Sequence, residues 1–412
     1  LDEKADSALG NVCYTACTGR SHFNHRIAVQ GSPHQEIRDG LKAYLDGKRS
    51  RSVSIGTGTN RNPQLAFLFT GQGSQYVGMG RSLYETQPVF RTAVETCAEL
   101  FSDHLDRSIL DLIYGDNADE DSLAQTQYTQ SAIFTIQYAL SQLWDSWGIK
   151  PDFIAGHSIG EYAGACIAGV LILEDAVKLV AARGKLMQSL QAGGAMAAVF
   201  AGEADLLPFV ESKSTELSIA ALNAPGSAVI SGKAETVAEV AGRLKEKGIS
   251  ARELNVSHAF HSPLMEPILE SFRDVASKVA YMPAHVPLVS TVTGKKATAG
   301  DLASADYWTR QIREAVRFQA AAETLSEEGA NVFLELGALP TLTGLAARTL
   351  SPDEHLFLPS LKKGEEDWNI LLKSVGDLYV NNVDVDWRGF DGPYVRQKID
   401  VPSYPFQRKR YY

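Results

Sequence analysis

No apolar run in the sequence approaches the about 20 residues that a helix needs to cross a bilayer, and no signal peptide is visible. We therefore expect no membrane partner. Only four of the 412 residues are cysteine, too few for a disulfide framework in a chain of this size. Cys13 and Cys17 stand apart from other ligand residues, so no metal site is expected, and reduced thiols fit a cytoplasmic protein. Internal repeats and low-complexity tracts are also missing.

The chain has fewer basic than acidic residues, with 39 Lys and Arg and 49 Asp and Glu. Its formal net charge at pH 7 is −10. Phosphates would be repelled, so we expect no nucleic-acid partner. The composition, with 44% hydrophobic and 21% charged residues, is that of an ordinary globular protein. The length suits one large α/β domain with appendages. Because the first residue is Leu1, we expect the chain to be excised from a longer one.

The N-terminal part, residues 1–60, has the pattern of a small α/β unit. Residues 25–31 have strand character, and residues 36–45 have helical spacing. The stretch 49–63 is rich in Ser, Gly, Thr and Asn, which predicts a linker.

Beyond the linker, apolar strands alternate with helical patterns. We predict strands at 65–69, 151–155 and 331–336, helices over much of 80–148 and near 174–190, and a glycine turn at 70–75. Such alternation favours a mostly parallel sheet. We expect a large α/β-hydrolase-like core.

Residues 194–257 have a different texture, with short strands and two helical stretches. Their predicted order is strand, helix, strand, strand, helix, strand, which is typical of a ferredoxin-like module. We expect this module to be inserted into the large domain. The tail 391–412 is rich in Pro, Tyr and Arg, has little periodicity, and is expected to lie over other surfaces.

The most informative stretch is the pentapeptide 156–160, Gly-His-Ser-Ile-Gly, between the predicted strand 151–155 and a predicted helix at 162–168. A Gly-x-Ser-x-Gly motif in this context predicts a nucleophile elbow. The glycines permit a tight turn, and the helix N-terminus favours negative charge beside Ser158. This geometry suits acyl transfer through a serine ester. The alternative is a small-residue turn that only packs a helix on a strand.

A serine nucleophile needs a base, and histidine suits that role near neutral pH. Of the nine histidines, we expect the His157 side chain to point away from Ser158. The candidates that remain are His258 and His261, which could equally both be surface residues.

Four motifs together resemble one family, the acyltransferase domain of modular type I polyketide synthases, a relative of malonyl-CoA:acyl carrier protein transacylase. In family order they are Gly-Gln-Gly-Ser-Gln at 71–75, Gly-His-Ser-Ile-Gly-Glu at 156–161, Ala-Arg-Gly at 182–184 and His-Ala-Phe-His at 258–261. Residues 12–29 are similar to the linker after a ketosynthase, and residues 401–408 to the linker after an acyltransferase. Nearly the whole chain is therefore covered.

The resemblance implies a domain division. A ketosynthase-to-acyltransferase linker domain would occupy residues 1–62, and the α/β core would occupy 63–193 and 258–360. The ferredoxin-like subdomain would occupy 194–257, and a C-terminal helix with the post-acyltransferase linker would occupy 361–412.

The resemblance also implies catalytic roles. Ser158 would be the nucleophile and His261 its general base. A backbone carbonyl takes the place of a triad acid in the family, and Gln311 matches the residue that orients the histidine. The oxyanion hole would be made by the N–H groups of Gln72 and Ile159.

Further residues would choose the acyl group. An arginine such as Arg183, in a helical pattern, is usually a surface residue, but the family arginine at this position binds the free carboxylate of a malonyl group. Ile159, His258 and Phe260 match the malonyl-selective pattern, with Phe260 filling space beside C2. Asn223 is a candidate cleft residue or a turn asparagine.

The implied function is transfer of malonyl from malonyl-CoA, through a seryl ester, to the phosphopantetheine thiol of an acyl carrier protein. Neighbouring synthase domains would be partners, and no bound cofactor is expected. The alternatives are a serine hydrolase or thioesterase with the same elbow, or an idle scaffold domain that would lack Ser158 or His261.

Overall fold

The structure, a computed structural model, describes residues 6–32, 34–56, 62–256, 258–298, 300–402 and residue 410. The chain divides into two compact units. The first comprises residues 1–62, 144–149 and 372–412, and the second comprises residues 63–143 and 150–371. From the sequence we expected residues 361–412 to form a separate C-terminal segment. The structure groups residues 372–412 in one unit with the N-terminal residues. No helix in the described ranges is long and apolar enough to cross a membrane.

The first unit contains a two-stranded antiparallel sheet with helices. Its elements are α1 (Asp6–Gly19), β1 (Arg26–Val29), α2 (His34–Leu45), β2 (Val53–Gly56) and α17 (Trp387–Phe390), together with the end of α16 (Asp367–Val380). Strand β2 corrects the sequence prediction, which took this stretch for linker. The strand forms because Ile55 and Val53 face Ile27 and Val29 of β1 in register, and pairs of β-branched residues stabilise neighbouring strands.

The C-terminal segment of this unit follows α1. The backbone N–H of Gln397 donates to Asn11 Oδ1 at 2.9 Å, and that of Ile399 donates to Thr15 Oγ1 at 3.0 Å. The tail therefore lies along a helix of its own unit, up to Pro402. Residues 403–408, on which the resemblance to a post-acyltransferase linker depends, lie outside the described residues, as does Ser257.

The core of the second unit is a six-stranded sheet of order β10-β9-β4-β3-β11-β12. Its strands are β3 (Leu65–Phe69), β4 (Phe153–Gly156), β9 (Leu288–Ser290), β10 (Lys295–Lys296), β11 (Val332–Leu336) and β12 (Leu356–Pro359). All neighbouring pairs are parallel except β9 and β10. Every residue of β3, β4 and β11 is buried, as in a sheet covered on both faces.

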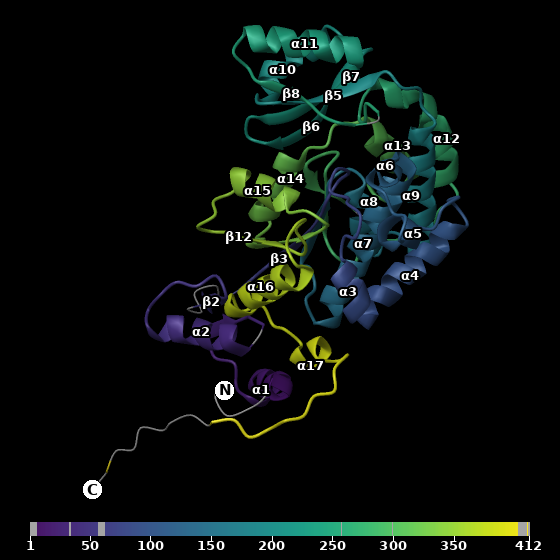
Figure 1. The fold of residues 1–412 in the computed structure, drawn as a ribbon. Coiled ribbons are helices and arrows are strands. Elements are labelled where there is room, and N and C mark those ends of the chain that lie inside the picture. Colours follow the sequence, from purple (N-terminus) through teal and green to yellow (C-terminus); the bar gives the residue numbers. More distant parts are fainter. Residues whose placement is uncertain are drawn as a thin grey trace. The chain divides into compact units, whose positions relative to one another are not determined.

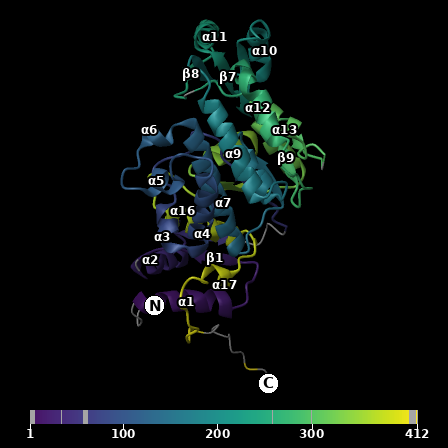
Figure 2. The same ribbon diagram turned by 90° about the vertical axis from the view of Figure 1, so that its right-hand side faces the viewer.

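The second unit also contains helices outside residues 194–253. They are α3 (Arg81–Thr86), α4 (Pro88–Ser102), α5 (Ile109–Tyr114), α6 (Glu120–Leu123), α7 (Thr126–Ser146), α8 (Gly160–Ile167), α9 (Leu173–Gln188), η1 (Pro263–Met265), α12 (Glu266–Ala276), α13 (Ala305–Arg313), α14 (Phe318–Glu327) and α15 (Thr341–Thr349). Helix α8 packs on β3, β4 and β9, and α15 packs on β3, β11 and β12. Helix α9 runs beside α12 (Figure 2).

Residues 194–253 form a smaller subdomain of the second unit, with the element order predicted from the sequence. Its elements are β5 (Gly194–Val199), α10 (Glu203–Glu211), β6 (Leu217–Ala224), β7 (Ser227–Lys233), α11 (Ala234–Glu246) and β8 (Ala251–Glu253). The four strands form an antiparallel sheet of order β6-β7-β5-β8, and both helices lie on one face of it (Figure 1). Apolar side chains from sheet and helices form a core of their own.

The two central strands of the large sheet, β3 and β4, bring two of the predicted motifs together. β3 and β4 are parallel neighbours, so their carboxyl ends meet at one edge. The turn 70–75 follows β3, and the elbow 156–160 follows β4. Ligands of open α/β sheets bind outside the carboxyl ends of the strands, and the motifs predicted to carry the chemistry meet there.

Candidate active site

Ser158 lies in a tight turn between β4 and α8. The strand ends at Gly156 and the helix begins at Gly160. A Cβ on Gly156 would collide with the backbone of Glu161, and one on Gly160 would collide with the carbonyl of Phe69, so only glycine fits at both positions. Ser158 has a φ of 51°, a strained conformation that is concentrated at functional sites. The turn has the geometry of a nucleophile elbow.

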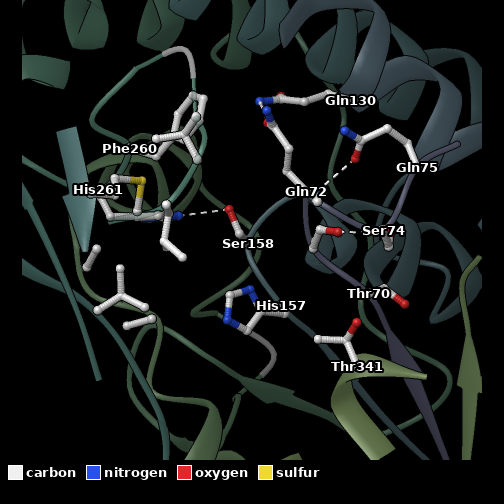
Figure 3. A pocket seen from close by; sticks show the side chains of 18 of the residues that line it. Thr70, Gln72, Ser74, Gln75, Gln130, His157, Ser158, Phe260, His261 and Thr341 are labelled. Carbon is white, nitrogen blue, oxygen red and sulfur yellow. Dashed lines mark hydrogen bonds between the residues drawn. The ribbon is translucent and has the colours of Figure 1, made fainter. Parts of the chain in front are cut away.

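His261 lies within hydrogen-bonding distance of Ser158. The Ser158 hydroxyl donates to His261 Nε2 at 2.8 Å (Figure 3). Because a carbonyl only accepts, Nδ1 carries the ring proton and donates it to the backbone oxygen of Glu314 at 2.8 Å. Burial, helped by the nearby Arg183 and His157, lowers the pKa of His261 to about 3. The imidazole is therefore neutral at neutral pH, with a free lone pair toward the serine.

The predicted role of Gln311 is wrong, because the carbonyl that orients His261 belongs to Glu314, one helical turn later. Gln311 lies on α13 and acts with its side chain instead. Its Nε2 donates to the carbonyl oxygen of Ser158 at 2.6 Å and to Glu161 Oε2 at 3.3 Å. Gln311 lies in the last turn of α13 and Glu314 is the residue at its C-terminal cap, so the C-terminal end of this helix reaches both the serine and the histidine.

Arg183 is a buried cation beside the nucleophile. It projects from α9 and is 1% exposed, which overturns the surface alternative. Its Nη2 donates to Ser158 Oγ at 3.1 Å, and its guanidinium lies 5.6 Å from the Tyr162 ring centroid. Burial lowers the pKa of Arg183, and its Nε has no hydrogen-bond partner. Glu161 acts on it electrostatically, but within the described part of the chain no carboxylate forms an ion pair with the guanidinium.

The two backbone N–H groups predicted to form the oxyanion hole have no acceptor among the described residues of the protein. Within the described ranges, neither Gln72 N–H nor Ile159 N–H donates to a protein acceptor. The turn that carries Gln72 is braced on both sides, because Ser74 Oγ donates to the carbonyl of Gly71 at 3.1 Å and Gly73 N–H donates to Gln75 Oε1 at 2.8 Å. Figure 3 shows Ser158 between this turn and His261.

The side chain of His157 makes no hydrogen bond to the Ser158 hydroxyl, which bonds to His261, and is directed toward the smaller subdomain. Its Nε2 donates to Asn223 Oδ1 at 2.9 Å, and its ring lies 6.1 Å from that of Phe318. Burial lowers the pKa of His157. Asn223 belongs to β6 of the smaller subdomain, so this hydrogen bond links the subdomain to the elbow across the site.

A cavity of about 530 Å³ opens at this point. The core contributes Gln72, His157, Ser158, Arg183 and His261 to its wall, and the smaller subdomain contributes Met196, Ala220, Ala221, Asn223 and Val229, with Leu254 to Val256 following it. Helix α15 adds Thr341, Leu342 and Leu345. The volume is ample for a small acyl group together with part of a longer carrier arm.

Comparisons with known proteins agree with this geometry. Residues 66–385 match the family described as acyl transferase domain. The chain belongs to that family. Residues 1–41 match a second family, described as CurL-like, PKS C-terminal. The homologues are polyketide synthases, so this is an acyltransferase domain of the polyketide synthase type, related to malonyl-CoA:acyl carrier protein transacylases.

Three relatives document the match. Polyketide synthase GfsA from Streptomyces halstedii is 40% identical over 98% of this chain, which spans only 5% of that synthase's length. The acyltransferase domain from the second module of the salinomycin polyketide synthase is 40% identical, with a TM-score of 0.85 over 93% of this chain and 89% of the other. Malonyl CoA-acyl carrier protein transacylase from Clostridium perfringens is 30% identical, with a TM-score of 0.67 over 73% and 93%.

The three residues predicted to select the acyl group differ from one another in their position relative to the cavity of the acyltransferase. Phe260 is 7% exposed and lines the cavity beside His261 (Figure 3). The His258 ring lies behind it, 6.2 Å from the Phe260 ring, and donates to the carbonyl of Leu190 at 3.2 Å. The side chain of Ile159 is fully buried and is not part of the cavity wall. Of the three side chains, only that of Phe260 lines the cavity.

Sequence reasoning missed one feature of this site, the carboxyl group of Glu161. Glu161 lies in the first turn of α8 and is fully buried. An acidic residue in a first helical turn ordinarily indicates a favourable interaction with the helix dipole, so its sequence position did not single it out. The usable signal was its place one residue after the last glycine of the elbow, where its Cα packs against Gly156.

Proposed function

We propose that this domain takes a malonyl group from malonyl-CoA, carries it as an ester on Ser158, and passes it to the phosphopantetheine thiol of an acyl carrier protein. The observation that carries the proposal is the buried Arg183 guanidinium, 3.1 Å from Ser158 Oγ and without a carboxylate partner in the described structure. A malonyl group bound as a thioester has a free carboxylate that would neutralise this charge.

Acylation would follow from the hydrogen bonds of the site. As Ser158 Oγ attacks the thioester carbonyl, its proton moves to His261 Nε2, and the carbonyl of Glu314 stabilises the resulting imidazolium through Nδ1–H. Negative charge develops on the carbonyl oxygen, and the N–H groups of Gln72 and Ile159 would receive it. The proton on His261 then goes to the sulfur of coenzyme A as the thiol leaves.

Transfer to the carrier would repeat these steps with a different thiol. His261 accepts the proton of the phosphopantetheine thiol, the sulfur attacks the ester on Ser158, and the serine leaves with the proton. A hydrolase would use water in this second step. The presence of Ser158 and His261 in bonding contact argues against an idle scaffold.

Replacing Arg183 by alanine should change the choice of acyl group as well as the rate. Formation of the malonyl ester should fall on the order of 100-fold, because a charge-assisted bidentate contact is lost. Formation of the acetyl ester should fall less, because an acetyl group leaves the parent guanidinium unpaired. The measurement is competition between malonyl-CoA and acetyl-CoA, read by the mass of the acyl-enzyme.

Arg317→Ala is the matched control, because Arg317 is a half-exposed arginine of the same unit, paired with Glu203 at 3.2 Å. Its malonyl-to-acetyl ratio should equal that of the parent. If Arg183→Ala left the malonyl-to-acetyl ratio unchanged, Arg183 would not bind the carboxylate. The reason to prefer malonyl as the substrate would then be lost.

The extender unit can be tested at Phe260. Phe260→Ser should admit methylmalonyl-CoA better than the parent does, by roughly 10- to 200-fold at most, because one methyl contact is worth only ~1–3 kcal/mol. Malonyl transfer should weaken somewhat, because a smaller side chain positions the acyl group less tightly. His258→Tyr, which acts behind Phe260, should have a smaller effect alone. If the unsubstituted domain loaded methylmalonyl as readily as malonyl in competition, the assignment of malonyl-CoA as the substrate would be wrong.

Separating transfer from hydrolysis needs only the isolated acyl-enzyme. Incubated without carrier, the malonyl ester on Ser158 should persist, and addition of a phosphopantetheine-bearing carrier protein should move the malonyl group onto the carrier. Rapid release of free malonate without carrier would instead identify a hydrolase.

A further inference from the structure

A buried network beneath the elbow contains groups that the mechanism above does not use. Its hub is the carboxyl group of Glu161, which is fully buried. Oε1 accepts from Thr291 N–H at 3.1 Å and from Tyr307 O–H at 2.5 Å, and Oε2 accepts from Gln311 Nε2 at 3.3 Å. These donors are neutral, and Glu161 forms no ion pair with any residue in the described part of the chain. Burial raises the pKa of Glu161 to about 7.

The network reaches the nucleophile through two links. Gln311 uses the same Nε2 to donate to Glu161 and, at 2.6 Å, to the carbonyl oxygen of Ser158. Thr291 Oγ1 lies 2.9 Å from the carbonyl oxygen of Gly156 and 3.2 Å from Glu161 Oε2. The carboxyl group therefore secures the backbone on both sides of Ser158, whose positive φ is unfavourable by itself.

The same helix that supplies Gln311 also orients the base. Tyr307 and Gln311 of α13 both bind Glu161, and Glu314, which follows the last residue of α13, accepts from His261 Nδ1. A shift of α13 relative to the elbow would therefore change the distance between Ser158 Oγ and His261 Nε2. Misplacement of reacting groups by about 1 Å can cost a hundredfold in rate.

We propose that Glu161 and Gln311 are positioning residues that set the Ser158–His261 geometry by tying the nucleophile elbow to helix α13. The inference rests on the proposed function in one respect, that Ser158 is the nucleophile. It assigns the pair no contact with substrate. Glu161 acts through Gln311, so the two residues should behave as one unit.

The variant E161Q tests the hub with almost no change of shape. If the new amide nitrogen takes the place of Oε1, it faces the backbone N–H of Thr291, which can only donate, and Tyr307 can accept from it only by turning its own proton to Ser290 Oγ, 2.7 Å away. If it takes the place of Oε2, it faces the Nε2 donor of Gln311. Rotating the Gln311 amide would relieve that conflict only by turning its oxygen toward the carbonyl of Ser158. The variant therefore cannot satisfy all contacts.

The experiment measures Ser158 reactivity with an alkyl fluorophosphonate, which needs no thioester substrate. The phosphorus–oxygen bond forms at Ser158 Oγ, fluoride leaves, and the serine proton goes to His261. E161Q and Q311M should each slow labelling roughly 10- to 100-fold, and E161Q/Q311M should be no slower than the worse single variant. Malonyl-CoA acylation should fall by the same factors with the dissociation constant of malonyl-CoA unchanged.

Asp367→Asn is the matched control. Asp367 is a buried carboxyl of the same unit whose pKa is raised to about 6 by burial, and it accepts from the N–H of Ser82 at 3.1 Å, outside the cavity wall. This variant should label within about threefold of the parent. Unfolding temperatures of all variants separate lost stability from lost reactivity.

Three results would overturn the proposal: labelling of Q311M at the parent rate, a double variant whose loss equals the product of the single losses, or an equal loss in Asp367→Asn. Because Q311M removes the same link from the helix side, it decides the matter even if E161Q does not fold. A parent that labels at Ser158 but forms no ester with malonyl-CoA would contradict the proposed function alone.

Discussion

Ser158→Ala is expected to leave no acyl-enzyme at all, whichever acyl-CoA is supplied. The substitution removes a single oxygen, the one that donates to His261 and accepts from Arg183, and no neighbouring group can form the ester in its place. Alanine at this position keeps the volume of the turn, so the fold should persist. The measurement is intact mass after incubation with malonyl-CoA, together with an unfolding curve.

Ser74→Ala is the appropriate comparison, because Ser74 is a buried serine of the same cavity wall. It should still yield the ester, at a reduced rate, since its hydroxyl braces the turn that carries Gln72. A stable malonyl adduct on Ser158→Ala would mean that another residue is the nucleophile.

His261→Ala should slow acylation roughly 10²- to 10⁴-fold, the range for loss of a general base. The ring is the one group that joins Ser158 Oγ to the carbonyl of Glu314. Without it the serine proton has no acceptor at bonding distance. Single-turnover acylation with malonyl-CoA in excess measures the rate constant directly.

His258→Ala should lower the same rate constant by less than tenfold, although it removes an equally buried imidazole. His258 bonds to the carbonyl of Leu190 and lies behind Phe260, so its loss affects packing more than chemistry. Equal losses in the two variants would withdraw the assignment of His261 as the base.

The elbow and the alternation of elements were accessible from the sequence, because each depends on local chemistry. Glycines at 156 and 160 are required by contacts within a few residues or with the adjacent strand β3, and the apolar strands β3, β4 and β11 are buried along their whole length. Strand β2 was missed because its residues lie in a polar, glycine-rich stretch, and only its pairing with β1 shows it to be a strand.

The orientation of the base was predicted from the wrong residue for a physical reason. A backbone carbonyl has no side-chain signature, so the sequence pattern, which led to Gln311, could not distinguish that residue from Glu314. Gln311 and Glu314 are one turn apart, and the structure assigns the carbonyl to Glu314 and the side-chain contact to Gln311. His157 lines the cavity and bonds to Asn223, a contact between residues 66 positions apart that the sequence pattern could not show.

Arg183 and Glu161 illustrate the limit of composition and periodicity. Both are charged residues within helices, where the ordinary expectation is exposure to solvent, and both are buried beside the elbow. Burial of a charge is decided by residues distant in sequence, here Ser158 for Arg183 and Thr291, Tyr307 and Gln311 for Glu161. The resemblance to a family supplied the role of the arginine, and it supplied none for the glutamate.

The central claim, that Ser158 carries a malonyl group chosen by its carboxylate, is tested most directly by the intact mass of the unmodified domain. The domain is incubated with equal concentrations of malonyl-CoA, methylmalonyl-CoA and acetyl-CoA, and the modified peptide is then sequenced. We predict one malonyl group per chain, attached to Ser158, with acetyl and methylmalonyl esters in the minority. Predominant acetylation, or an acyl group on any other residue, would contradict the account.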